Sequence, residues 1–162
     1  MSDVLSRIPL VYEPLKKNRF ILRFPSDLGL QEFTLESAQR PTLTVNSVEI
    51  PFLDAKTYVA GAYSWGEITV SFRDVIGPST SQAVMEWDRL CAESVSGRMG
   101  YAAGYKRDVE LAMLDPNKTV IQKWILVNAW ITQSNFGELS MSDDGIATIT
   151  ITLRPDYCIL CY

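Results

Sequence analysis

The stretch from Thr119 to Leu153 constrains the fold more than any other part of the sequence. Its first half, Thr119 to Thr132, is rich in Val, Ile, Thr and Trp, the residue types that suit a pleated strand. From Trp124 to Ile131 nearly every position is apolar. We therefore expect a strand covered on both faces, by a core on one side and by a second sheet, a helix or another subunit on the other. Because a straight strand of this length would span roughly 45 Å at ~3.3 Å per residue, we predict a bend or bulge at Asn128, the polar interruption.

The end of this stretch alternates strictly between apolar and polar residues. Alternation of this kind is typical of a half-buried strand. The residues expected on the buried face are Ala147, Ile149, Ile151 and Leu153, and those expected on the other face are Thr148, Thr150 and Thr152. A row of three threonines should therefore lie on a hydrated, uncharged surface.

The remaining sequence predicts short strands joined by turns, with one helix. Strands are expected at residues 18–24, 32–36, 42–50, 65–73 and 105–113. In the second of these, Phe33 and Leu35 should face inward and the residues between them outward. Ser79 and Gln82 have capping-box spacing before an apolar helical stripe, which predicts a helix at about residues 80–95 that Gly97 ends. Asp115–Lys118 predicts a tight turn into the Thr119 stretch.

Two segments are predicted to have neither strand nor helix. Residues 1–17 contain two prolines and should form an extended N-terminal arm. Residues 52–64 (FLDAKTYVAGAYS) should form a long apolar loop that is buried or meets a partner. A chain of 162 residues is expected to be one domain, 1–162. The predicted fold class is mainly β: an antiparallel β-barrel or sandwich of two packed sheets with one flanking α-helix.

The composition argues against catalysis. The sequence has no histidine, the commonest general base, so none of its serines has a histidine to activate it. The carboxylates of Glu32 and Glu36 would lie about 13 Å apart on a strand, too far for a glycosidase pair. A net charge of −4 argues against tight binding to nucleic acid. We expect no enzymatic activity and no cofactor.

The sequence also predicts no metal site. Its three cysteines, Cys91, Cys158 and Cys161, are expected to be reduced thiols. Cys158 and Cys161 have the spacing of a metal or redox motif, but structural zinc needs four ligands, and residues three apart on a strand point to opposite faces. Buried or surface thiols are therefore favoured over a metal site. Asp143–Gly145 lacks the further oxygens of a calcium loop and predicts a turn instead.

The polar faces of the predicted strands are the remaining signal. Together they would form a hydrated, mildly acidic surface of small side chains. An antiparallel sheet commonly turns such a face to solvent, and the alternative is that the face lines a lumen. The candidate lumen-facing residues are Glu32, Thr34, Glu36, Glu67, Thr69, Ser71, Thr148, Thr150 and Thr152.

Three stretches, in their order and spacing, resemble the tail tube proteins of contractile-tailed bacteriophages. They are YSWGEITVSFRD (Tyr63–Asp74), which leads into the helix with Trp87, KWILVNAWITQSNFGELS (Lys123–Ser140) and IATITITLRPDYCIL (Ile146–Leu160). The segment NRFILRF and the overall length are also similar to this family. The resemblance covers most of the chain, and nothing is carried over for residues 98–118.

The resemblance implies a structural subunit of a viral tail tube. Such subunits form hexameric rings that stack into a hollow tube, and strands of each subunit build a continuous lumenal barrel. The tube would lie inside a contractile sheath and meet baseplate and tail-terminator proteins at its ends. The viral DNA would pass through the lumen without specific binding, and the protein would have no stable membrane insertion. The implied location is the virion tail, assembled in the host bacterial cytoplasm.

Composition suggests where the rings would touch. The 1–17 arm and the 52–64 segment are candidate ring-to-ring contacts, with Tyr58, Val59 and Tyr63 as the candidate residues. Two alternatives stay open. One is the inner tube of an extracellular contractile injection or type VI secretion device, whose subunit chemistry is the same. The other is a monomeric β-sandwich that binds carbohydrate or peptide on a platform of Tyr58, Tyr63 and Tyr101.

Overall fold

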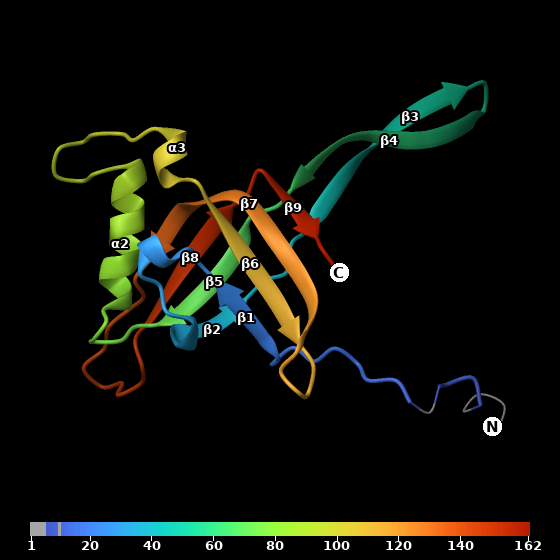
Figure 1. Ribbon diagram of the computed structural model, residues 1–162. Helices are drawn as coiled ribbons and strands as arrows, with labels where there is room; N and C mark the ends of the chain where they lie inside the picture. The colour runs from blue at the N-terminus through green and yellow to red at the C-terminus, as the bar shows by residue number, and fades with distance from the viewer. Residues whose placement is uncertain (1–5, 10) are drawn as a thin grey trace.

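The computed structural model describes residues 6–9 and 11–162. Its main sheet is antiparallel, with strands in the order β1-β6-β7-β8-β5-β2 and β9 also paired to β7, while β3 and β4 form a separate hairpin (Figure 1). The strands are β1 (Phe20–Arg23), β2 (Leu35–Ala38), β3 (Leu43–Phe52), β4 (Ala55–Trp65), β5 (Ile68–Arg73), β6 (Arg107–Leu114), β7 (Val120–Asn135), β8 (Thr148–Arg154) and β9 (Tyr157–Leu160). The helices are η1 (Ser26–Leu28) and η2 (Glu32–Thr34), both 3-10, and α2 (Thr80–Cys91) and α3 (Ala102–Tyr105).

Strand β7 belongs to both layers of the fold because it bends near its middle. Its first half pairs with β6 and β9, and its second half pairs with β8. At the bend, Asn128 has a φ of 54°, and the β6–β7 register shifts between Arg107 and Val109. The predicted bend at Asn128 is confirmed. It divides the sheet into two packed layers, β1-β6-β7-β9 and β7-β8-β5-β2.

The hydrophobic core lies between these two layers. One layer contributes alternate residues of β5 and β8, each at most 1% exposed: Ile68, Val70, Phe72, Ile149, Ile151 and Leu153. The other layer contributes Leu22, Val109, Leu111 and Leu126. The predicted alternation of β5 and β8 and the mainly β, sandwich-like fold class are confirmed. Strands β1 and β2 stand at the two ends of the strand order, so the barrel is open between them.

Helix α2 flanks the sheet and is anchored by its one tryptophan. The Ser79 hydroxyl accepts a hydrogen bond from the Gln82 N–H at 3.3 Å, so the predicted cap is confirmed. Trp87 is 2% exposed and donates its Nε1–H to the Tyr105 carbonyl at 2.8 Å. The helix ends at Cys91, earlier than the predicted residue 95, because the chain becomes extended at the next residue and bridges back to the chain near residue 99. Within the described residues, no helix is long and apolar enough to cross a membrane.

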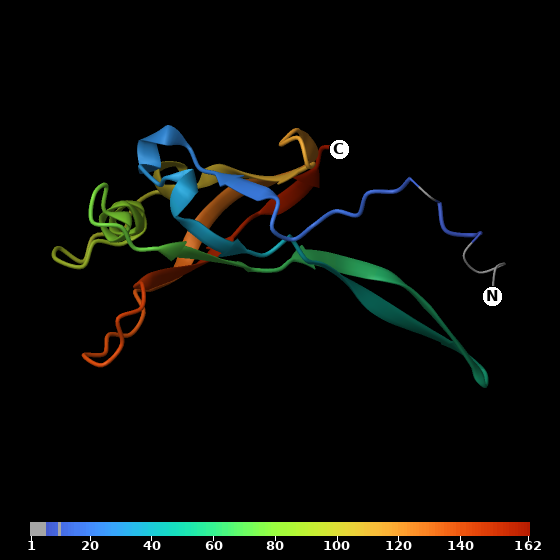
Figure 2. The same ribbon diagram turned by 90° about the horizontal axis from the view of Figure 1, so that it is seen from below.

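The prediction of a long loop over residues 52–64 is wrong. These residues form most of β4, which pairs with β3 over nearly its whole length as a hairpin that projects from the body (Figures 1 and 2). The predicted strand end at Pro51 is also wrong, since β3 continues through it to Phe52. Proline is tolerated in a strand that has a partner on just one side, because the other edge of the strand makes no ladder hydrogen bonds. Residues 6–9 and 11–17 of the predicted arm run away from the body, while residues 1–5 and 10 lie outside the described residues.

The predicted strand over residues 32–36 is wrong in its first half. Residues 32–34 form the 3-10 helix η2, and β2 begins only at Leu35. The Thr34 hydroxyl donates to the Gln31 carbonyl at 2.7 Å, and this bond favours the turn over an extended chain. As a result Phe33 is 65% exposed and Thr34 is 1% exposed, which reverses the predicted orientation.

The prediction that both faces of β7 are covered holds for one face only. Leu126, Ala129 and Ile131 are buried in the core. Trp124, on the same face, packs against the edge of the core and against Trp65, with ring centroids 6.4 Å apart. On the other face, Ile125, Val127 and Trp130 are only half-buried. A single chain therefore leaves part of this apolar face exposed to solvent.

Both predicted turns are present. The Lys118 N–H donates to the Asp115 carbonyl at 3.0 Å and closes the turn between β6 and β7. The Gly145 N–H donates to Asp143 Oδ1 at 2.9 Å, so this carboxylate holds a turn.

Candidate functional site and assembly surfaces

Five of the predicted lumen-facing residues lie together on the outer face of β5 and β8. We call this surface the hydroxyl face; its members are Thr69, Ser71, Thr148, Thr150 and Thr152. The two strands are paired in a register that sets Thr69 opposite Thr152 and Ser71 opposite Thr150. The Ser71 and Thr150 hydroxyl oxygens are 3.3 Å apart, within hydrogen-bond distance. Because their neighbours in sequence form the core, these hydroxyls face away from it.

Amide side chains of β7 extend the hydroxyl face on one side. Gln133 pairs with Thr152 and Asn135 with Thr150, and both amides are exposed. Neither amide was among the predicted lumen-facing residues, because the strand was expected to end at Thr132. The alternation of Gln133, Ser134 and Asn135 is the signal that could have found them, since Ser134 turns inward and donates to Asp88 Oδ2 at 2.7 Å.

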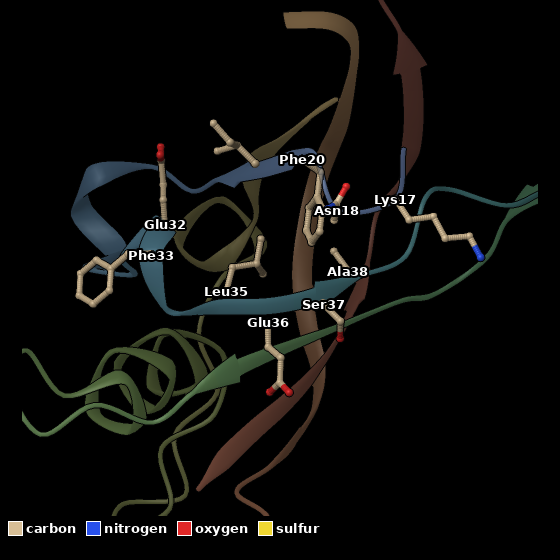
Figure 3. Close-up of a pocket in the computed structure, with 10 residues that line it drawn as sticks. Lys17, Asn18, Phe20, Glu32, Phe33, Leu35, Glu36, Ser37 and Ala38 are labelled. Carbon is tan, nitrogen blue, oxygen red and sulfur yellow. The ribbon is translucent and has the colours of Figure 1, made fainter. Parts of the chain in front are cut away.

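Among the described residues, charged side chains border the hydroxyl face and leave its centre uncharged. Glu67 and Arg154 form an exposed ion pair of 3.9 Å at one end, and Arg73 lies opposite Thr148 at the other. Glu36 is exposed on β2, on the side of that strand opposite Leu35 (Figure 3). Two acidic and two basic side chains thus border a centre that carries no charge. The predicted mildly acidic character is wrong for this surface.

Two of the nine predicted residues do not join this face. Thr34 is a buried side chain in η2, and Glu32 lies in the same 3-10 helix. Glu32 Oε1 is 3.3 Å from Arg23 Nε, in an exposed ion pair with β1. The prediction placed Glu32 and Thr34 on the polar face of a strand. It is wrong for both because residues 32–34 form a 3-10 helix instead.

A groove of about 760 Å³ separates β1 from β2. It is the opening of the barrel, and Figure 3 shows the side chains of both edges. Phe20, Leu35 and Ala38 give it apolar walls, while Lys17 and Glu32 lie at its rim. Among the described residues, β1 pairs only with β6 and β2 only with β5, so one edge of each strand is unpaired. Unpaired strand edges bind a further strand readily, so each side of this opening could pair with one.

The β3–β4 hairpin exposes apolar side chains on both of its faces. Tyr58, Val59 and Tyr63 are 63%, 47% and 68% exposed. Tyr58 pairs with Glu49 and Tyr63 with Val45, and these partners lie an even number of residues apart on β3. Tyr58 and Tyr63 therefore share one face of the hairpin, whereas Val59 points to the other. The second face carries Val48, Ile50 and Phe52 beside Val59.

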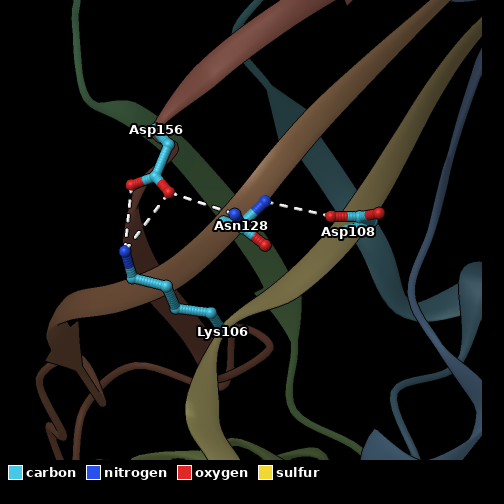
Figure 4. Close-up of polar contacts among 4 residues, drawn as sticks. All are labelled: Lys106, Asp108, Asn128 and Asp156. Carbon is cyan, nitrogen blue, oxygen red and sulfur yellow. Dashed lines mark hydrogen bonds and ion pairs between the residues drawn. The ribbon is translucent and has the colours of Figure 1, made fainter. Parts of the chain in front are cut away.

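A cluster of four polar residues holds the bend of β7 (Figure 4). The Asn128 N–H donates to Asp108 Oδ1 at 3.0 Å, and its amide Nδ2 donates to Asp156 Oδ2 at 3.1 Å. Lys106 Nζ lies 3.0 Å from Asp156 Oδ1. The hydrogen bond from Lys106 lowers the pKa of Asp156 below its usual range, so the carboxylate stays ionised at neutral pH. These contacts join three parts of the chain where β7 changes layers.

Away from these surfaces, two described groups, Cys158 and Asp88, have a shifted pKa. Burial raises the pKa of the Cys158 thiol to about 11, which makes it a poor nucleophile. Cys158 is buried, Cys91 is half-buried and Cys161, just after β9, is exposed. Burial also raises the pKa of Asp88, although the bond from Ser134 opposes this shift. Within residues 6–9 and 11–162, no three acidic or cysteine side chains cluster as metal ligands would.

No family model matches the sequence, and no curated protein matches it. Solved structures do match the fold over almost the whole chain. A chain in the anti-feeding prophage cap, which terminates the tube of that particle, is 19% identical with a TM-score of 0.74, and 97% of each chain is covered. A chain in the sheath/tube terminator of an extracellular contractile injection system, PVC, is 18% identical with a TM-score of 0.76, covering 94% of this chain and 99% of the other.

A more distant match is found in a bacterial protein. Hcp1 from Flavobacterium johnsoniae is 9% identical with a TM-score of 0.56, covering 88% of this chain and 94% of the other. The chain therefore has the fold shared by tube-type proteins of contractile injection systems, in agreement with the resemblance of its sequence to tail tube proteins.

Proposed function

We propose that this protein is a non-enzymatic structural subunit whose copies form hexameric rings that stack into a hollow tube of a contractile tail-like particle. The observation that carries the proposal is the open sheet, which ends in unpaired strand edges and turns an uncharged hydroxyl face away from the core. The fold match to tube-type proteins supports it. A tail-like sheath would lie outside the tube, with baseplate and terminator proteins at its ends.

Ring closure follows from two unpaired edges of one layer. One is the outer edge of β2, and the other is the edge of β7 over residues 131–135, because among the described residues β6 pairs with β7 only as far as Ala129. Joining the first edge of one copy to the second edge of the next gives a head-to-tail interface, which closes into a ring when the rotation fits. Closure also removes both exposed edges. The layers β7-β8-β5-β2 of six copies then form one continuous inner wall.

In this arrangement the hydroxyl face lines the lumen. Its uncharged centre neither holds nor strongly repels a charged cargo, because tight retention of phosphate requires clustered Lys and Arg. DNA would therefore pass without specific binding, and a polypeptide would pass equally well. One of the matching solved structures belongs to an extracellular contractile injection system, which favours the inner tube of such a device as a second candidate beside a genome-conducting phage tail. Packaged nucleic acid in purified native particles would identify the phage tail, and its absence the injection device.

A crosslinking experiment tests the ring contact. Ser37→Cys on β2 and Asn135→Cys on β7 are introduced together in a Cys161→Ser background, which removes the exposed native thiol. A short bis-maleimide should give a ladder of crosslinked products that ends at the hexamer. The matched control joins Asn135→Cys to Tyr101→Cys, since Tyr101 is 90% exposed and lies beside α3 rather than on the sheet edge. A ladder no stronger than in the control would contradict the proposed ring.

The binding-module alternative loses its main support in the structure. Tyr58 and Tyr63 lie on the projecting hairpin, whereas Tyr101 precedes α3, which Figures 1 and 2 place at the other end of the molecule. The three tyrosines do not form one platform.

A further inference from the structure

The loop between β7 and β8, residues 136–147, is a second exposed apolar projection. We call it the acidic loop. Leu139, Met141 and Ile146 are 91%, 109% and 70% exposed. The loop also carries Glu138, Asp143 and Asp144 and has no basic residue. Exposed apolar groups gathered in one projection commonly mark a protein interface.

The acidic loop is held in shape by its own hydrogen bonds. The Gly137 N–H donates to Asn135 Oδ1 at 2.9 Å, and the Ser140 and Ser142 hydroxyls are 3.0 Å apart. Gly137 has a φ of 81°, and a Cβ there would lie 2.7 Å from the Thr148 carbonyl oxygen, so only glycine fits this position. A loop that is already ordered loses little conformational freedom when it binds.

The acidic loop and the β3–β4 hairpin lie at opposite ends of the β5–β8 ladder. The loop leads into Thr148, which pairs with Arg73 at one end, and the hairpin leads into Ile68, which pairs with Leu153 at the other. Figure 2 shows the hairpin and the N-terminal arm extending from one side of the body and the loop from the other. The described part of the arm carries Arg7, Lys16 and Lys17, and no described acidic group is in an ion pair with them.

These two ends are complementary in charge, and both expose apolar side chains. At the arm and hairpin end, Glu13 and Glu49 are paired with Arg19 and Lys56, which leaves the basic arm residues in excess over Asp54. The loop end combines acidic side chains with exposed Leu and Met. When the two ends of a subunit carry different surfaces that are complementary to each other, copies of the subunit can join head to tail. We propose that the acidic loop of each subunit docks on the hairpin and arm of a subunit in the next ring. This proposal rests on the proposed tube function, and it makes the acidic loop the surface on which the hairpin of the next ring binds.

A charge-reversal experiment tests the contact. The loop variant carries Glu138→Lys and Asp144→Lys, leaving Asp143 to hold its turn. The arm variant carries Arg7→Glu and Lys16→Glu, because Lys17 lies at the rim of the groove beside β2, where rings would close. Each alone should reduce the amount of protein that sediments as tubes at least roughly tenfold, because like charges would then face each other. Rings should persist, since they close through strand edges. Combining the two variants should restore tubes.

Two further variants keep the result interpretable. The control Glu86→Lys with Glu93→Lys reverses two charges on and after α2, outside the proposed contact, and should assemble as the unaltered protein does. Leu139→Ser should shorten tubes without changing the melting temperature, because its side chain is 91% exposed. Loop variants that stack normally, or a combined variant that does not recover, would overturn the contact. Unaltered protein that forms no rings would instead refute the tube function itself.

Discussion

Asn128 gives the sharpest test of how the fold is built, because its backbone conformation sets the bend of β7. We predict that Asn128→Val destabilises the protein substantially and that Asn128→Gly does not. Asn128 has a φ of 54°, in the left-handed region that asparagine and glycine tolerate and a β-branched residue does not. The backbone bond from its N–H to Asp108 is available to all three residues, so the comparison isolates the conformational cost.

The magnitudes follow from two contributions. The left-handed conformation costs an ordinary L-residue about 1–2 kcal/mol. Loss of the side-chain bond to Asp156 costs about 1 kcal/mol, less than is usual for a charged acceptor because the contact is exposed. Asn128→Val should therefore lower the free energy of unfolding by about 2–3 kcal/mol, or the melting temperature by roughly 4–12 °C for a chain of this size. Asn128→Gly loses the bond but not the conformation, and should stay within about 1 kcal/mol of the unaltered protein.

Urea denaturation followed by tryptophan fluorescence measures both variants. It should be done at low protein concentration, where assembly does not add to stability. The slope of the unfolding curve should be unchanged, since the variants expose the same surface on unfolding. Equal stabilities for the valine and glycine variants would refute the claim that the bend depends on a left-handed residue.

Three other predictions concern packing, charge and thiols. Trp87→Phe should lower the free energy of unfolding by about 2–3 kcal/mol, measured by urea denaturation, because it loses a buried hydrogen bond and leaves a cavity. Asp88→Asn should keep or raise the melting temperature at neutral pH. Burial raises the pKa of Asp88 in the folded protein above its usual 3.8, so the stability of the unaltered protein falls as the pH rises through the raised pKa. The variant has no carboxyl group at this position and should lack this fall. In mass spectrometry after treatment with a thiol reagent, Cys161 should be modified in the folded protein and Cys158 only after unfolding, since burial raises the Cys158 pKa to about 11. An unchanged urea midpoint would refute the first prediction, and a lower melting temperature of Asp88→Asn at neutral pH would refute the second. Equal labelling rates of Cys158 and Cys161 in the folded protein would refute the third.

Local sequence signals predicted the elements that pack against the core. The alternation from Ile68 to Phe72 and from Ile149 to Leu153 follows directly from burial of one face, and the cap at Ser79 marks the start of α2. Asn128 was identifiable because a polar residue within an apolar run has to be accommodated. In each case the same interaction that stabilises the fold leaves a pattern in the sequence.

Elements outside the core could not be predicted in this way. The β3–β4 hairpin has no core to bury one face. The strand predicted at 42–50 is present as β3, but the apolar residues of β4 follow no simple alternation, so residues 52–64 resembled a loop. The alternation from Glu32 to Glu36 predicted a strand, but the Thr34 hydroxyl favours a 3-10 turn that only the three-dimensional structure reveals. The hydroxyl face was predicted in part, and Gln133 and Asn135 join it only through their register with β8.

Electron cryomicroscopy of the purified chain tests the central claim most directly. We predict sixfold rings that stack into hollow tubes, with the face containing Ser71 and Thr150 lining the lumen and the edge of β2 against β7 of the neighbouring copy. A protein that remains strictly monomeric at high concentration, and is not recruited when preformed baseplates are added, would contradict the account.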